Sequence, residues 1–102
     1  MKQEFFTRSF LADLADMTER NDHTGALLSV ADWAAWNMIG SGKGRIYAMI
    51  ADGFDNIRRR QDEIGFLDEN LLRCRCEFSA MLFRCIEEDF GRSCSDLVKK
   101  CL

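Results

Sequence analysis

The sequence contains no proline, a single histidine and no long apolar segment. Because proline interrupts helices, its complete absence leaves the whole chain open to helix formation. One histidine gives no local basis for a Ser-His-Asp arrangement, and a Cys-His pair would have to be assembled by tertiary contact. The longest uninterrupted apolar run, 46–51, is far shorter than the roughly 18 residues of a membrane helix. We therefore predict neither an enzyme nor a membrane protein.

Excess positive charge is also lacking, because the formal net charge is −3. A chain of this charge gathers no nucleic acid by counterion release, which disfavours nucleic acid as a partner. Residues 1–8 lack the apolar core of a secretory signal, so we expect a cytoplasmic location. The length of 102 residues, with 47% apolar and 30% charged residues, is typical of one folded domain over residues 1–102.

Glycine marks the breaks between the apolar patterns. Glycine permits the left-handed conformation that ends helices, and six of the seven glycines lie at such breaks: Gly25, Gly40, Gly42, Gly44, Gly65 and Gly91. The spacing of apolar residues predicts helices over 2–20, 24–39, 45–64 and 67–90, and a short one from 93 or 95 to the end. The predicted fold class is all-α, a compact bundle of four to five helices.

Two details of these helices can be predicted from single residues. Asp22 or Thr24 could accept the free amide hydrogens at the start of the second helix. Gly53 lies in the middle of the third helix, where glycine costs roughly 1 kcal/mol relative to alanine. Such a glycine indicates either close packing against a neighbour or a local bend.

Two predicted helices carry more apolar surface than a simple amphipathic pattern requires. The second helix is apolar on nearly all sides, and the fourth has two apolar stripes beside one face of mixed charge. Helices of this kind lie in the centre of a core or are covered by another chain. The bundle is therefore complete within one chain or is completed by homodimerisation.

The segment 40–44, Gly-Ser-Gly-Lys-Gly, resembles the end of the phosphate loop of adenylate kinases and related nucleoside-phosphate kinases. That loop needs a glycine at position 37 and a hydroxyl residue at position 44, where this chain has Asn37 and Gly44. The strand that should precede the loop is replaced by an apolar helix. We interpret the segment as a helix-helix turn.

The cysteines number five, an odd count, and all lie in the last third of the chain. This is typical of reduced thiols and not of a secreted disulfide framework. Cys74 and Cys76 point about 200° apart on a helix, so they cannot both bind one tetrahedral metal. We expect the thiols to behave as small buried hydrophobes, with Cys94 and Cys101 as the two that could be exposed. No metal or other cofactor is predicted.

The two tryptophans, Trp33 and Trp36, lie within about 60° of each other on the second helix. Inside a monomer they would fill the core. On a surface helix they would anchor a partner, because tryptophan and arginine dominate interface energetics.

The run Arg58, Arg59 and Arg60 could contact phosphate or an acidic partner. However, Asp55, Asp62 and Glu63 lie at helical pairing distances, which favours a neutralised surface helix. Together, the candidate partner-binding residues are Trp33, Trp36, Arg58, Arg59 and Arg60.

The sequence favours a small non-catalytic protein-protein interaction module, a regulator, adaptor or inhibitor that binds a macromolecular partner and could form a homodimer. The first alternative is a nucleic-acid-binding regulator that uses the Arg58–Arg60 helix. The second alternative is a thiol/metal-binding helical protein, in which the cysteines hold a metal or act in redox chemistry. No small-molecule substrate is evident.

Overall fold

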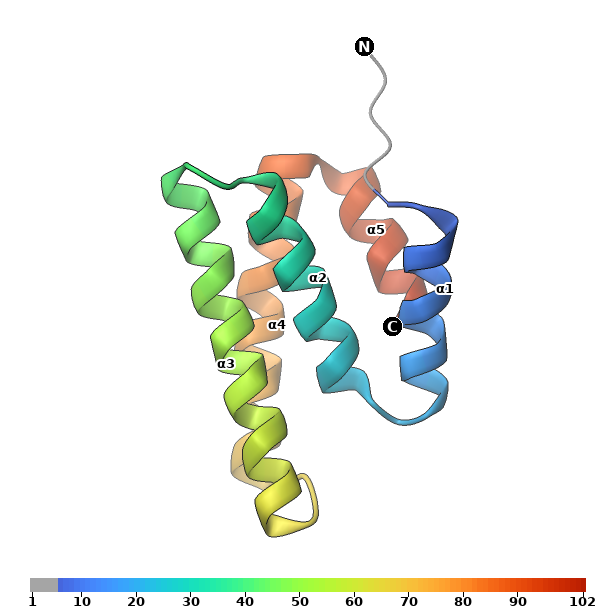
Figure 1. The fold of residues 1–102 in the computed structure, drawn as a ribbon, viewed down its shortest axis with the longest axis vertical. Helices are drawn as coiled ribbons and strands as arrows, with labels where there is room; N and C mark the ends of the chain where they lie inside the picture. The colour runs from blue at the N-terminus through green and yellow to red at the C-terminus, as the bar shows by residue number, and fades with distance from the viewer. Residues whose placement is uncertain (1–5) are drawn as a thin grey trace.

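The computed structural model describes residues 6–102, which form an all-α bundle of five helices (Figure 1). The helices are α1 (Arg8–Glu19), α2 (His23–Asn37), α3 (Gly42–Ile64), α4 (Glu69–Phe90) and α5 (Arg92–Cys101). This arrangement confirms the predicted fold class. The predicted start of the first helix, over residues 2–5, lies outside the described part of the chain. No helix within residues 6–102 combines the length and apolar character needed to cross a membrane.

Side-chain caps fix where four of the helices begin. Thr7 accepts a hydrogen bond from the Phe10 amide, and Asp22 accepts one from the Gly25 amide, both at 3.0 Å. Ser41 and Asp68 cap α3 and α4 in the same way. These oxygens bind amide hydrogens that have no partner inside the helix. Of the two caps expected for the second helix, Asp22 is therefore the one that is used.

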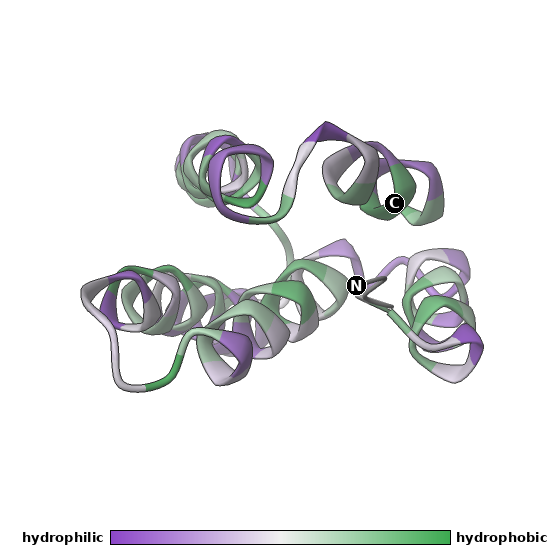
Figure 2. Cartoon of the chain, turned by 90° about the horizontal axis from the view of Figure 1, so that it is seen from above, coloured by the Kyte–Doolittle hydropathy of each residue, from purple (hydrophilic) through white to green (hydrophobic). Residues whose placement is uncertain are grey.

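The helices form two layers. Seen from above in Figure 2, α1, α2 and α3 make one layer and α4 and α5 the other, with hydrophobic residues gathered where the layers face each other. The helix α2 is central, because it packs against α1, α3 and α4. The α3–α4 hairpin extends beyond the N-terminal start of α2, as the lower part of Figure 1 shows.

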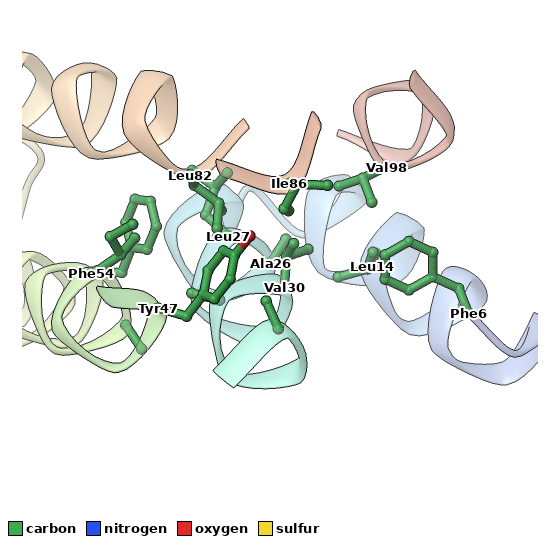
Figure 3. Close-up of a cluster of buried hydrophobic side chains, with 14 of the residues drawn as sticks. Phe6, Leu14, Ala26, Leu27, Val30, Tyr47, Phe54, Leu82, Ile86 and Val98 are labelled. Carbon is green, nitrogen blue, oxygen red and sulfur yellow. The ribbon is translucent and has the colours of Figure 1, made fainter. Parts of the chain in front are cut away.

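The core lies around α2. Leu27 and Val30 of α2 meet Tyr47 and Phe54 of α3 and, from the second layer, Leu82 of α4 (Figure 3), and all five side chains are buried. Most of the apolar surface predicted for the second helix is thus covered within the chain. The exception is its C-terminal end.

Gly53 allows close packing between α3 and α4. A Cβ atom at this position would lie 2.6 Å from the ring of Phe78, whose centroid is 6.0 Å from that of Phe54. Real Cβ atoms do not approach a neighbour so closely. Of the two interpretations of this mid-helix glycine, close packing is confirmed.

The two apolar stripes of α4 are only partly covered. Leu82 and Ile86 are buried, whereas Leu72 and Met81 are exposed. Within this chain the two stripes are therefore covered only in part, and the exposed Leu72 lies where the α3–α4 hairpin extends past α2. The face of mixed charge is exposed to solvent, as predicted, and comprises Glu69, Asn70, Arg73, Glu77, Arg84, Glu87 and Glu88.

Candidate interaction groove

The two tryptophans have different surroundings, although only three residues separate them. Trp33 is half-buried in an aromatic cluster, with ring centroids 4.2 Å from Phe6 and 4.9 Å from Phe90. Phe10 stands further out, at 6.5 Å. Trp33 of α2 therefore packs between the N-terminal end of α1 and the C-terminal end of α4.

Trp36 and Ile39, in contrast, are each 73% exposed. They lie at the end of α2, where the chain leaves the helix at Met38 and reaches Gly40 with a φ of 84°. A left-handed residue at this point ends the helix and directs the chain into α3. Two large apolar side chains are thus exposed to solvent, Trp36 in the last turn of α2 and Ile39 in the turn that follows it.

A groove runs beside these two residues, between α2 and α3. It has a volume of about 730 Å³ and is open to solvent. Its larger lining residues are Trp36, Ile39, Asp32, Arg45 and Asp52, and its small ones are Ala35, Gly40, Ser41, Gly42, Gly44, Ala48 and Ala51. The small residues let the two helices approach closely and leave the hollow between them.

The charges in the groove are separated along its length. Arg45 lies in the first turns of α3, whereas Asp52 lies seven residues further on, about 10 Å along the helix axis. Asp32 of α2 lines the groove together with Asp52. Partial burial raises the pKa of Asp32, and the neighbouring carboxylates Asp52 and Asp55 raise this pKa further. The groove is therefore apolar at the turn and acidic one to two helical turns away.

Sequence reasoning identified Trp36 but missed Asp32, Ile39, Arg45 and Asp52. A signal was available: Asp32, Trp36 and Ile39 follow a spacing of four and three, which places them on one helical face. Arg45, Ala48 and Asp52 follow a spacing of three and four on α3. What the sequence does not reveal is that these two faces adjoin.

The three arginines lie elsewhere on α3 and are all paired. Arg59 contacts Asp55 at 3.2 Å, and Arg60 contacts Glu63 at 3.9 Å. These pairs confirm the neutralised surface expected from helical spacing. Arg58 pairs across the fold with the capping residue Asp22, at 3.0 Å. The structure does not bring the arginines together with Trp36, because Arg58 and Arg45 are about 20 Å apart along the axis of α3.

The segment 40–44 connects two helices, as interpreted from the sequence, but only its residues 40 and 41 lie between them, and residues 42–44 form the first turn of α3. The Lys43 ammonium lies 3.4 Å from Asp89 Oδ1 on α4 and 3.9 Å from Glu88 Oε2. The Tyr47 hydroxyl donates a hydrogen bond of 2.7 Å to the second oxygen of Asp89. Burial and this hydrogen bond raise the pKa of Tyr47 far above its ordinary value. Lys43 and Tyr47 thus fasten the start of α3 to the end of α4, which makes them structural.

The cysteines are distributed differently from the expectation. Cys74 and Cys76 are exposed, because they lie in the N-terminal half of α4, which extends past α2. In contrast, Cys94 is buried and Cys101 half-buried. Burial raises the pKa of Cys94 to about 11. The expectation that the helical thiols are buried is wrong for Cys74 and Cys76, and the expectation of exposure is wrong for Cys94. Over residues 6–102, no three His, Cys, Asp or Glu side chains are grouped as metal ligands.

Comparison of the chain with protein-family models, curated protein sequences and solved structures finds no match.

Proposed function

We propose that this protein is a small non-catalytic protein-protein interaction module that binds its partner in the groove between α2 and α3. The observation that carries this proposal is the exposed pair Trp36 and Ile39 beside an open groove. Tryptophan is the residue type most enriched among those that dominate binding energy. A tryptophan side chain offers roughly 150–250 Å² of surface. Covering its exposed part would contribute about 3–4 kcal/mol at 25 cal/mol per Å².

The lining of the groove favours binding over catalysis. It contains neither histidine nor cysteine, and its one hydroxyl side chain, Ser41, is already engaged. Ser41 Oγ donates to the Met38 carbonyl at 2.7 Å and accepts from the Gly44 amide at 3.3 Å. A nucleophile needs a base within hydrogen-bond reach, and Ser41 instead caps a helix. The open shape suits a macromolecule better than an enclosed small ligand.

The arginines give little support to the nucleic-acid alternative. Each guanidinium of Arg58, Arg59 and Arg60 lies within 4 Å of a carboxylate, so the segment offers little free positive charge to phosphate. The surface thiols of Cys74 and Cys76 suit a reducing compartment such as the cytoplasm, where disulfides are rare.

Parallel affinity capture with matched variants tests this function. Wild-type protein, Trp36→Ala and Phe66→Ala would be immobilised in equal amounts and exposed to lysate of the source cells. Phe66 is the control, because it is a large aromatic residue that is 59% exposed but lies far from the groove. Circular dichroism would first establish that all three proteins have equal helix content.

The expected result is a protein that wild type and Phe66→Ala retain and that Trp36→Ala loses about tenfold or more, as for a binding hot spot. Quantitative mass spectrometry of the eluates provides the measurement. If every retained protein is recovered equally with Trp36→Ala, the groove is not the interaction site and the proposal is wrong.

A further inference from the structure

The two walls of the groove have the repeat of a helix. Asp32 and Trp36 lie on α2 and Ile39 lies just past its end, whereas Arg45, Ala48 and Asp52 lie on α3; the first and last residues of each set are seven positions apart. The α3 wall is therefore about 10 Å long at the helical rise of 1.5 Å per residue. Small residues between the walls give room for the ridge of a third helix. Two adjacent helices with a hollow between them are typical receptors for an amphipathic helix.

The acidic end of the groove has unsatisfied charge. Neither Asp32 nor Asp52 has an ion-pair partner among the residues that the structure describes. The neighbouring carboxylates also disfavour the ionised form of Asp32, since they raise its pKa. A cationic group placed between two such carboxylates removes their repulsion and is attracted by both.

We infer that the groove binds an amphipathic helix of a partner protein, with an apolar side chain against Trp36 and Ile39 and a lysine or arginine between Asp32 and Asp52. This inference rests on the proposed function and names the chemistry of the partner. Asp32 is four residues from Trp36 on α2 and seven from Ile39, which lies just past the end of that helix. The partner helix therefore carries its cationic residue four to seven positions from its apolar anchor.

A second copy of this chain fits the groove less well. In a symmetric dimer the same patch meets itself, so Arg45 of each copy could pair with only one of the two carboxylates, Asp32 and Asp52, of the other copy. Two patches that are each net negative would be pressed together in a region of reduced solvent. The repulsion between the remaining carboxylates disfavours this contact. Charge complementarity thus favours a different, cationic chain.

Selection from a displayed library tests this inference without knowledge of the natural partner. The library would present helix-forming peptides of about 15 residues, roughly four turns, randomised along one face. Selection against the wild-type protein should enrich peptides that carry a large apolar residue and a lysine or arginine four to seven positions apart. The enriched peptides would then be synthesised and their affinities measured by fluorescence polarisation.

Matched variants locate the binding site. Trp36→Ala should weaken binding about tenfold or more, whereas Phe66→Ala should leave binding unchanged. The double variant Asp32→Asn/Asp52→Asn should weaken binding about three- to tenfold and lose most of its salt dependence. Asp62→Asn is the control for charge, because it removes an exposed carboxylate from the far end of α3.

Three outcomes would overturn the inference, and they differ in what they mean for the proposed function. Enriched peptides that need Trp36 but lack a basic residue would refute the cationic partner and leave the interaction groove in place. If no enriched peptide depends on Trp36, the helical occupant is refuted, and the lysate capture decides the proposed function on its own. A dimer in light scattering that Trp36→Ala dissociates would identify a second copy as the occupant.

Discussion

Replacing Gly44 by alanine should destabilise the protein, although alanine is the better helix former. Gly44 lies in the first turn of α3, where this helix passes the end of α2. A Cβ atom at this position would lie 2.4 Å from the carbonyl oxygen of Met38 and 3.1 Å from its carbonyl carbon. Both atoms belong to the backbone, so no side-chain rotation relieves the contact. The same carbonyl accepts hydrogen bonds from Ser41 Oγ at 2.7 Å and from the Ser41 amide at 3.2 Å.

The magnitude follows from two opposing effects. An overpacked methyl group that shifts the backbone costs about 1–3 kcal/mol. The gain in helix propensity is at most about 1 kcal/mol, and the contact should therefore prevail. Gly42 is a matched control, because it lies in the same turn, and a Cβ atom there meets nothing within 4 Å. Gly42→Ala should stabilise the protein by about 0.4–1 kcal/mol, since it restricts the unfolded chain.

Urea and thermal unfolding, followed by circular dichroism, provide the assay. At about 4–8 °C per kcal/mol for a domain of this size, the melting temperatures of the two variants should differ by roughly 10 °C, on opposite sides of wild type. A Gly44→Ala variant as stable as wild type would refute the close approach of α3 to α2, and with it the geometry of the groove. Equal losses at both positions would show that the turn, and not this contact, is sensitive.

Three further predictions concern buried polar groups and thiols. Asp89→Ala should cost about 1–3 kcal/mol in urea unfolding, because it leaves the buried Tyr47 hydroxyl without its acceptor. Glu88→Ala, at the exposed neighbour, should change stability by less than about 0.5 kcal/mol. Equal effects of the two substitutions would contradict the buried hydrogen bond. Ser95→Ala should stabilise the fold by about 1 kcal/mol in the same unfolding assay, because the Ser95 hydroxyl is buried without a hydrogen-bond partner among residues 6–102. A loss of stability would show that this hydroxyl does have a hydrogen-bond partner. Iodoacetamide at pH 8, followed by mass spectrometry, should modify exposed Cys74 first and Cys94 only after unfolding. The reason is that burial raises the pKa of the Cys94 thiol to about 11, so this thiol stays protonated at the pH of the assay. Early modification of Cys94 would contradict its burial.

Local signals were sufficient for the helices and for the pairing of neighbouring charges. The start of α2 follows from Asp22, and the end of α3 from Gly65, whose φ of 94° no other residue type adopts readily. The pairs of Arg59 with Asp55 and of Arg60 with Glu63 follow from helical spacing. Each of these features depends on residues within one turn of each other. The sequence therefore contains the information directly.

Contacts between distant segments could not be predicted in this way. Arg58 pairs with Asp22, and Lys43 with Asp89, across the fold. Cys74 is exposed and Cys94 buried because the α3–α4 hairpin extends past α2, while α5 folds back onto α1 and α4. Periodicity shows that a helix has an apolar face, but it does not show how far a neighbouring helix reaches along that face.

The two tryptophans illustrate this division most clearly. The sequence by itself determined that Trp33 and Trp36 lie on one helix, close together around its axis, because helix formation depends on bonds between residues four apart. Only the tertiary structure decided that the rings of Phe6, just before α1, and Phe90 of α4 cover Trp33, while Trp36 stays exposed beside a groove that two helices make together. Burial is a property of the space around a residue, and distant parts of the chain fill that space.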